Sequence, residues 1–230
     1  WGYNGNARRY WDFLYGGKIR RIERQLHHYG SGLNAIPVLA HYREHPDDEY
    51  LLRVGYGGTM GALSNIDEEG FASVAFHSFP STLKWDPYTG DYGPNFFGHA
   101  FNVATYVINH PEFGWQSFGG NVTVSGDWVN VKTLDSFRKR VYIAPRGLWL
   151  TLDAGTFERV ALNKRSNVVR VSVSAATAFT PNARLRVQQP AQFASVGPYA
   201  PRQKFVNERD AFTIPLGRST ISVELIDKKP

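Results

Sequence analysis

The chain has 230 residues, of which 42% are hydrophobic, 14% aromatic and 20% charged, a composition typical of a globular protein of one or two domains. The absence of cysteine excludes a disulfide framework and any metal site built on cysteine, and no apolar run is long enough to span a membrane. The formal net charge of +6 favours an acidic partner, but no continuous stripe of Lys and Arg points to nucleic acid.

The chain starts at Trp1-Gly-Tyr-Asn-Gly-Asn, without Met and without a signal peptide. This beginning resembles the inside of an ordered protein. We therefore expect the remainder of a longer chain to lie upstream.

The first half of the chain is predicted to be helical. Apolar residues recur at helical spacing in four stretches, and Pro46 and Pro111 mark the ends of two of them. The run Tyr29-Gly-Ser-Gly-Leu interrupts the pattern, and Asp47 and Asp48 are natural starting residues for the third helix. The expected helices cover residues 17–28, 33–45, 49–56 (extending toward 63) and 96–109.

The second half alternates apolar and polar residues with a period of two, which is typical of half-buried strands. Gly126-Asp127 and Pro145-Arg-Gly147 provide turns, and no helix is predicted between the strands. Residues 190–209, rich in Pro, Gln and Ala, are expected to form a long loop. Strands are predicted at residues 121–125, 128–132, 140–144, 148–152, 168–174, 184–187 and 220–225.

Together these patterns predict an α+β chain, in which the C-terminal helices of an (α/α) toroid precede an antiparallel β-sandwich. A toroid has buried inner helices, which match the mostly apolar stretches at 33–42 and 97–108, and amphipathic outer helices, which match the stretch at 17–28. A plain helical bundle is the alternative. The boundary is expected near Phe118-Gly-Gly120, which gives a helical part at residues 1–118 and a sandwich at residues 121–230.

The loop at residues 81–99 is the most informative segment, because Gly and Pro at this density form a shaped loop. It combines aromatic faces, which can stack on sugar rings, with short polar side chains, which can hydrogen-bond to hydroxyl groups. An ordinary connecting loop with buried aromatic residues is the alternative. The candidate residues are Trp85, Asp86, Tyr88, Asp91, Tyr92, Asn95 and His99.

Two further clusters combine proton-transfer groups with groups that stabilise negative charge. His and Tyr can serve as base and acid, while Arg and Asn can bind a carboxylate or stabilise an enolate-like charge. The first cluster is Asn4, Asn6, Arg8 and Arg9, and the second is His27, His28, Tyr29 and Asn34. We expect the catalytic residues to be His28, Tyr29, Tyr92 and His99. We expect the substrate-binding residues to be Asn6, Arg8, Arg9, Asn34, Trp85, Asp86, Tyr88, Asp91 and Asn95.

Structural roles compete with several of these assignments. Asp86 and Asp91 each neighbour Pro or Gly and can form Asx turns. His28 can meet the last carbonyl groups of the helix expected to end there, and His99 lies on an apolar helix, where a buried and satisfied histidine is common. Structural roles are also assigned to three histidines near helix ends, His41, His45 and His110.

No cofactor and no metal site is predicted. The chain has no His-Glu-x-x-His sequence and no acidic Ca²⁺-loop signature, and Asp86 and Asp91 on one loop are thin support for a Ca²⁺ ion. The run Gly55-Tyr-Gly-Gly-Thr-Met-Gly lacks the Lys-Ser/Thr of a phosphate loop, which argues against nucleotide binding, and no serine nucleophile elbow is present.

Two segments, Trp1-Gly-Tyr-Asn-Gly-Asn-Ala-Arg-Arg-Tyr-Trp-Asp and His27-His-Tyr-Gly-Ser-Gly-Leu-Asn, resemble large exported carbohydrate-active enzymes that pair an (α/α) toroid with an antiparallel β-sandwich. Rhamnose–glucuronate lyases that trim arabinogalactan, and related families of unassigned function, are similar. The resemblance covers most of the chain. It implies a secreted, periplasmic or cell-surface location and a polysaccharide or oligosaccharide as the partner. The basic net charge of the chain favours an acidic glycan.

The expected function is that of part of an exported polysaccharide-degrading enzyme, a lyase that cleaves a uronate-containing glycan by β-elimination. A glycoside hydrolase of the same architecture is one alternative and would need two carboxyl groups, of which Asp86 or Asp91 could supply one. A non-catalytic carbohydrate-binding or surface scaffold module is the other alternative. Its stacking platforms would be Trp85, Tyr88, Tyr92 and Trp115.

Overall fold

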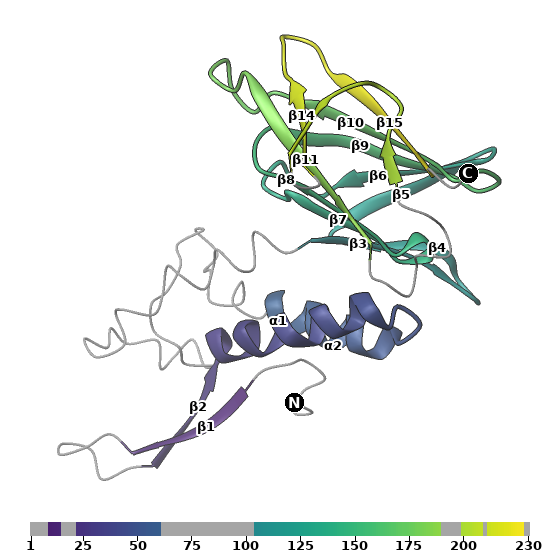
Figure 1. The fold of residues 1–230 in the computed structure, drawn as a ribbon. Helices are drawn as coiled ribbons and strands as arrows, with labels where there is room; N and C mark the ends of the chain where they lie inside the picture. Colours follow the sequence, from purple (N-terminus) through teal and green to yellow (C-terminus); the bar gives the residue numbers. More distant parts are fainter. Residues whose placement is uncertain (1–8, 15–21, 61–103, 190–198, 209–210, 228–230) are drawn as a thin grey trace. The chain divides into compact units, whose positions relative to one another are not determined.

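Figure 1 shows the computed structural model, which describes residues 9–14, 22–60, 104–189, 199–208 and 211–227, with side chains from Ala35 onward. The chain divides into two compact units, Trp1–Phe101 and Asn102–Pro230. Each unit has its own arrangement of secondary structure.

The first unit opens with a two-stranded antiparallel sheet. β1 (Arg9–Leu14) pairs with β2 (Ile22–His27), so that Arg9 lies opposite His27. The predicted helix at residues 17–28 is therefore wrong over Ile22–His27, while residues 17–21 lie outside the described part. Ile22 and Leu26 are four residues apart, which places them on one face of a helix but equally on one face of a strand. Pairing with β1 selects the strand.

A helical hairpin follows β2 directly. α1 (His28–Glu44) packs against α2 (Glu49–Met60), and the hairpin buries Leu39, Tyr42 and Leu52. Asp48 caps α2 as expected, because its Oδ1 accepts a hydrogen bond from the Leu51 N–H at 3.1 Å. The two helices predicted at residues 33–45 and 49–56 are confirmed.

The N-terminal part of α1 departs from the prediction. The run Tyr29-Gly-Ser-Gly-Leu, expected to interrupt the helix, forms its first turns, and Pro37 lies inside it. A glycine in a helix interior costs about 1 kcal/mol relative to Ala, and a proline about 3 kcal/mol. Local propensity therefore opposes this helix, and packing against α2 has to compensate.

The second unit consists of two β-sheets in a sandwich-like arrangement (Figure 1). In the six-stranded sheet the strand order is β12–β15–β10–β9–β6–β5, and every neighbouring pair is antiparallel. Its strands are β5 (Gly120–Ser125), β6 (Trp128–Thr133), β9 (Thr156–Asn163), β10 (Val168–Ser174), β12 (Tyr199–Pro201) and β15 (Ile221–Asp227).

The seven-stranded sheet has the order β13–β14–β11–β8–β7–β3–β4. Its neighbouring strands are antiparallel except for β3 and β7, which run parallel. A 3₁₀ turn (Ala144–Arg146) joins β7 to β8. The strands are β3 (Thr105–His110), β4 (Gly114–Phe118), β7 (Arg140–Ile143), β8 (Leu148–Leu152), β11 (Asn182–Gln188), β13 (Val206–Glu208) and β14 (Ala211–Pro215).

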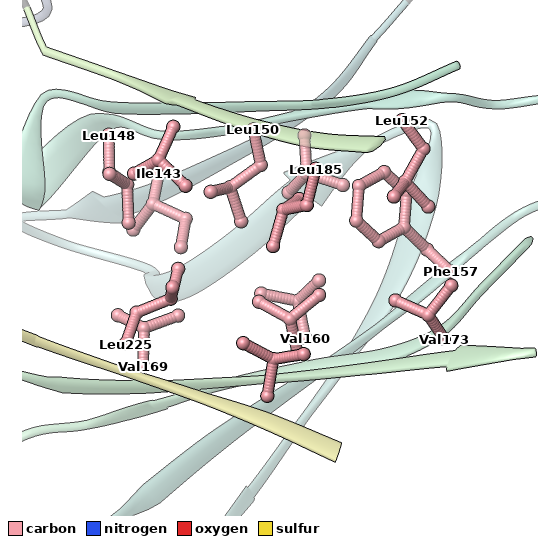
Figure 2. Packing of buried hydrophobic residues seen from close by; sticks show 14 of the residues in the cluster. Ile143, Leu148, Leu150, Leu152, Phe157, Val160, Val169, Val173, Leu185 and Leu225 are labelled. Atoms are coloured by element: carbon pink, nitrogen blue, oxygen red, sulfur yellow. The ribbon is translucent and has the colours of Figure 1, made fainter. Parts of the chain in front are cut away.

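The hydrophobic core lies between the two sheets. In Figure 2, Leu148, Leu150 and Leu152 of β8 face Val160 of β9 and Val169 of β10, and all five side chains are buried. Burial of each such side chain contributes about 1.5–3 kcal/mol. Because apolar residues alternate along these strands, the residues between them face away from the core.

In the second unit, the sequence pattern located seven strands correctly, assigned β3 to a helix, and did not predict β4, β9 and β14. The predicted strands are confirmed as β5, β6, β7, β8, β10, β11 and β15. The helix expected at residues 96–109 is wrong from Thr105 onward, where β3 forms, and residues 96–103 lie outside the described part. The segment Thr105–His110 is rich in β-branched and aromatic residues, and its pairing with β4 and β7 decides in favour of a strand.

The limits of the second unit also differ from the expected ones. β3 and β4 belong to the seven-stranded sheet, so this unit begins at Asn102 and not near Gly120. The loop expected at 190–209 contains the short strands β12 and β13, with residues 190–198 and 209 outside the described part.

The helical content of the described residues is limited to the hairpin and the short 3₁₀ turn. No (α/α) toroid is visible among these residues. In the part of the chain that the structure describes, neither α1 nor α2 combines the length and the apolar character that a bilayer crossing requires.

Candidate functional site

Four of the predicted site residues belong to described backbone. Arg9 starts β1, His28 and Tyr29 start α1, and Asn34 follows in the same helix. Arg9 lies opposite His27, the residue that directly precedes α1. The backbone therefore places a cationic residue of one predicted cluster close to the His-Tyr pair of the other.

The other predicted site residues lie outside the described part of the chain. The expectation that the residues around Tyr29 and around Tyr92 meet at one end of the helices stays a prediction. The residues concerned are Asn6, Arg8, Trp85, Asp86, Tyr88, Asp91, Tyr92, Asn95 and His99.

A polar surface with one large aromatic side chain forms on the outside of the six-stranded sheet. Val129 and Val131 of β6 belong to the core, so the alternating residues of that strand face outward. Strand pairing places Ala161 opposite Arg170, and Arg170 opposite Glu224. We call this surface the tryptophan face, and its residues are Thr123, Trp128, Asn130, Lys132, Arg159, Ala161, Arg170, Ser172, Ser222 and Glu224, of which Ala161 and Ser172 are buried beneath their neighbours.

A chain of contacts holds the indole of Trp128 in place. The guanidinium carbon of Arg170 lies 4.2 Å from the centroid of the indole ring, which is a cation–π distance. Arg170 Nε donates to Glu224 Oε1 at 3.2 Å, and Arg202 Nη1 pairs with Glu224 Oε2 at 2.7 Å. Ala161 belongs to β9, the strand between β6 and β10. Its small side chain leaves room for the Trp128 indole and the Arg170 guanidinium to meet. The protein itself therefore sets the orientation of Trp128.

Positive charge predominates on and beside the tryptophan face. The cations are Lys132, Arg159, Arg170 and Arg202, and the carboxylates are Glu158 and Glu224. Exposed ion pairs contribute about 0–1 kcal/mol each, so these contacts orient side chains more than they stabilise the fold. The face offers a half-buried indole, one plane of which the Arg170 guanidinium covers, together with amide, hydroxyl and cationic groups, a set that can bind an acidic sugar chain.

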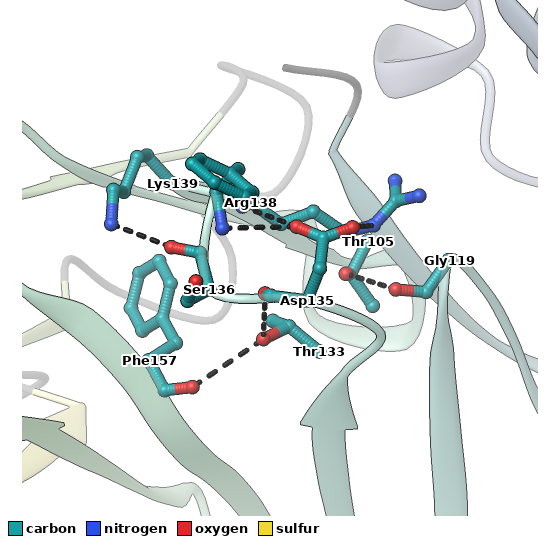
Figure 3. A network of polar contacts seen from close by, with 9 residues as sticks. Thr105, Gly119, Thr133, Asp135, Ser136, Arg138, Lys139 and Phe157 are labelled. Atoms are coloured by element: carbon teal, nitrogen blue, oxygen red, sulfur yellow. Dashed lines mark hydrogen bonds and ion pairs between the residues drawn. The ribbon is translucent and has the colours of Figure 1, made fainter. Parts of the chain in front are cut away.

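A second polar network holds the connection between β6 and β7 (Figure 3). Asp135 Oδ1 accepts hydrogen bonds from the N–H groups of Phe137 and Arg138 at 3.0 Å, and its Oδ2 pairs with the buried Arg138 guanidinium at 3.0 Å. Lys139 Nζ donates to the carbonyl groups of Ser136 and Gly155. Burial lowers the pKa of Lys139, and the nearby Asp135 partly opposes this effect. The polar groups of this network bond to main-chain groups and to one another, so we assign the network a role in holding the loop and not in binding a ligand.

A third group of polar side chains lies at the C-terminal end of α1. The ligand atoms of His41, Glu44 and His45 all lie within 4.8 Å of one another, and all three side chains are exposed. Sequence reasoning missed this cluster because it considered the order His-Glu-x-x-His and not the reversed order His-x-x-Glu-His. Helical spacing of three and four residues would have been sufficient to predict the proximity.

The comparisons with known proteins identify a family but not an activity. No curated protein and no solved structure matches the chain. The model of one family, described as "Family of unknown function (DUF5695)", matches residues 1–223, and the chain therefore belongs to that family.

Proposed function

We propose that this protein acts on polysaccharide and that its second unit binds a sugar chain on the tryptophan face. One observation carries the proposal: Arg170 holds Trp128 on an outward sheet face, and hydroxyl, amide and cationic groups surround it. Sugar rings offer C–H faces to aromatic planes and hydroxyl groups to polar side chains, so this set of groups is complementary to them.

The charge of the face favours a uronate-containing chain over a neutral one. Lys132 and Arg159 are exposed on neighbouring strands of the same face, and the whole chain carries a net charge of +6. Lys132 and Arg159 each adjoin the paired residues Val131 and Val160, so they lie side by side across two neighbouring strands. There they can pair with carboxylates of a uronate chain, and Arg can bind a carboxylate through two parallel hydrogen bonds.

We also propose that the complete protein is an exported lyase that cleaves such a glycan by β-elimination, at a secreted, periplasmic or cell-surface location. The reaction requires a group that neutralises the uronate carboxylate, a base for the C5 proton and an acid for the leaving oxygen. The register that places Arg9 opposite His27, next to His28 and Tyr29, supports this assignment. Tyr92 and His99 are the proposed partners for proton transfer.

The hairpin of α1 and α2 is the kind of unit that an (α/α) toroid repeats. On this proposal, further helical segments of the protein complete the toroid around the reaction site. A glycoside hydrolase built in the same way is the rival enzyme, with Asp86 or Asp91 as one of its carboxyl groups. The tryptophan face also fits a binding module without catalytic activity, because binding needs no acid–base pair.

Binding by the tryptophan face is tested with the substitution Trp128→Ala. We expect the affinity for a uronate oligosaccharide, measured by isothermal titration calorimetry, to fall about tenfold as the stacking plane is lost. The matched control is Phe179→Ala, which removes an aromatic side chain that is 93% exposed and lies outside the face. Equal affinity in the two variants would exclude the tryptophan face as the binding surface.

The reaction is tested by product analysis of the full-length protein. A lyase leaves an unsaturated uronate that absorbs in the near ultraviolet, a hydrolase leaves new reducing ends without this absorbance, and a binding module leaves neither. If the lyase product forms, His28→Ala or Tyr92→Phe should lower turnover by about 10²–10⁴-fold while circular dichroism shows an intact fold. Turnover near that of the wild type in both variants would remove these two residues from the mechanism.

A further inference from the structure

The side chains at the C-terminal end of α1 match the ligand chemistry of a transition-metal ion. His41 and Glu44 lie in the last turn of α1, and His45 directly follows the helix, with its N–H bonded to the His41 carbonyl, so the three side chains lie on one side. Two imidazole nitrogens and one carboxylate oxygen form a ligand set that zinc sites use with a fourth, open position. The set is poorly suited to Ca²⁺ and Mg²⁺, which take oxygen ligands.

The distances in the cluster suit a single bound ion. The ring centroids of His41 and His45 lie 4.4 Å apart, and the three ligand atoms lie within 4.8 Å of one another. Two ligand atoms on one tetrahedral zinc ion at its usual bond lengths are separated by about 3.3 Å. The three side chains are exposed, so small side-chain rotations can close the remaining difference without disturbing the core.

The backbone that carries the three residues is fixed from both sides. The His45 N–H donates to the carbonyl groups of His41 and Tyr42, each at 3.0 Å, and the Tyr42 side chain between the ligands is fully buried. The His45 carbonyl accepts from the Asp48 N–H at 3.1 Å, and Asp48 in turn caps α2. The helical hairpin therefore holds the ligand-bearing turn in one backbone conformation, which lowers the entropic cost of binding an ion.

The position at the end of the helix also favours a cation. The last carbonyl groups of an α-helix carry partial negative charge, which attracts positive charge within the final turn. A metal ion held by His41, Glu44 and His45 would lie at this end of α1, where Glu44 contributes a full negative charge.

We propose that His41, Glu44 and His45 form a binding site for a divalent transition-metal ion, with Zn²⁺ as the reference ion. Exposure of the three ligands leaves room for water or for a group from a partner molecule at the fourth position. The residues of the site belong to the first unit, and those of the tryptophan face belong to the second.

The test is a Zn²⁺ titration of the whole chain without a polyhistidine tag, after removal of bound metal with a chelator. We expect one Zn²⁺ ion per chain at this site by isothermal titration calorimetry. His41→Ala and His45→Ala should each weaken the affinity by at least about tenfold, because each removes one of three ligands. Glu44→Gln should weaken it less, because the amide keeps an oxygen ligand but not the charge. Co²⁺ provides a second readout through its visible absorption bands.

The matched control is His110→Asn, which removes a histidine in the second unit. His110 Nδ1 accepts hydrogen bonds from the N–H groups of Glu112 and Phe113, and the Asn side-chain oxygen can accept the same bonds. Zn²⁺ affinity in this variant should equal that of the wild type. The proposal is overturned if the wild-type chain does not bind Zn²⁺, or if His41→Ala and His45→Ala both bind it as the wild type does while circular dichroism shows an intact fold.

Discussion

At Asp153, burial and hydrogen bonding act on one carboxylate in opposite directions. Desolvation opposes ionisation, but hydrogen bonds from the Arg184 main chain and side chain outweigh it and hold the pKa of Asp153 below its ordinary value. The Arg184 N–H donates to Asp153 Oδ1 at 2.6 Å, and Arg184 Nε donates to Oδ2 at 2.9 Å. This pair fastens the turn after β8 to β11 at the edge of the core.

The lowered pKa predicts how this pair responds to acid. A carboxylate whose pKa is lower in the folded chain adds stability above its unfolded pKa, of about 4, and loses that contribution as the pH falls through the folded value. We therefore expect Asp153→Asn to destabilise the fold at pH 7 and to have a smaller effect at pH 3. Urea unfolding at both pH values measures the difference.

Making the Asp153→Asn substitution in a chain that also carries Arg184→Gln separates the contribution of the ion pair from other effects of the substitution on stability. In Arg184→Gln, the guanidinium partner is absent, so Asp153→Asn should change the pH dependence of stability less than it does in the wild type. If Asp153→Asn costs the same free energy at pH 3 and at pH 7, the carboxylate does not contribute through its ionised form.

At the scale of elements, two turns use glycine for different reasons, the hairpin turn between β5 and β6 and the connection from β8 in one sheet to β9 in the other. Gly126 between β5 and β6 has φ = +55° and nothing within 4 Å of the place where a Cβ would lie. Gly155 between β8 and β9 has φ = +75°, and a Cβ there would lie 2.7 Å from the Ser174 carbonyl oxygen. The first turn requires only a left-handed backbone, whereas the second also requires the absence of a side chain.

This difference predicts unequal effects of the same substitution. Gly126→Ala should cost about 1–2 kcal/mol, the penalty of a left-handed conformation for a residue with a Cβ. Gly155→Ala should cost at least about 3 kcal/mol, because the clash with a main-chain oxygen adds to that penalty. Chemical denaturation of both variants measures the two values. Equal losses would show that the backbone near Ser174 moves to accept the methyl group.

The elements that the sequence predicted are those with a strong local pattern. β8 and β10 alternate so regularly that their buried apolar residues could be named without a structure. β2 and β3 were assigned to helices because their apolar spacing fits both periods, and only the partner strands β1, β4 and β7 resolve the ambiguity. These partners are non-local, so a local pattern cannot contain the information.

The candidate sites were predictable to different degrees. The grouping of His41, Glu44 and His45 follows from helical spacing alone and was within reach of the sequence. The tryptophan face was not, because the contact between Trp128 and Arg170 depends on the order β6–β9–β10 and on a small residue, Ala161, in the strand between them. Strand order in a sandwich is a property of the whole sheet.

At the scale of the whole molecule, the chain combines two compact units with a net charge of +6. On the proposed tryptophan face, Lys132 and Arg159 are exposed cations that do not depend on the indole for their position. Their attraction for a uronate polymer acts through solvent, so dissolved salt should screen it. The Debye length is about 10 Å at 0.1 M salt and about 3 Å at 1 M.

We therefore expect affinity for a uronate polymer to fall steeply as NaCl is raised from 0.05 to about 0.5 M, while affinity for a neutral polysaccharide changes little, because stacking on Trp128 is not ionic. Affinity electrophoresis in gels that contain either polymer measures both. The double substitution Lys132→Gln and Arg159→Gln should flatten the salt dependence, whereas Arg140→Gln and Arg186→Gln, at exposed sites on the seven-stranded sheet, should not. A salt dependence that is equally steep in both double variants would mean that the net charge of the chain, and not the tryptophan face, attracts the polymer.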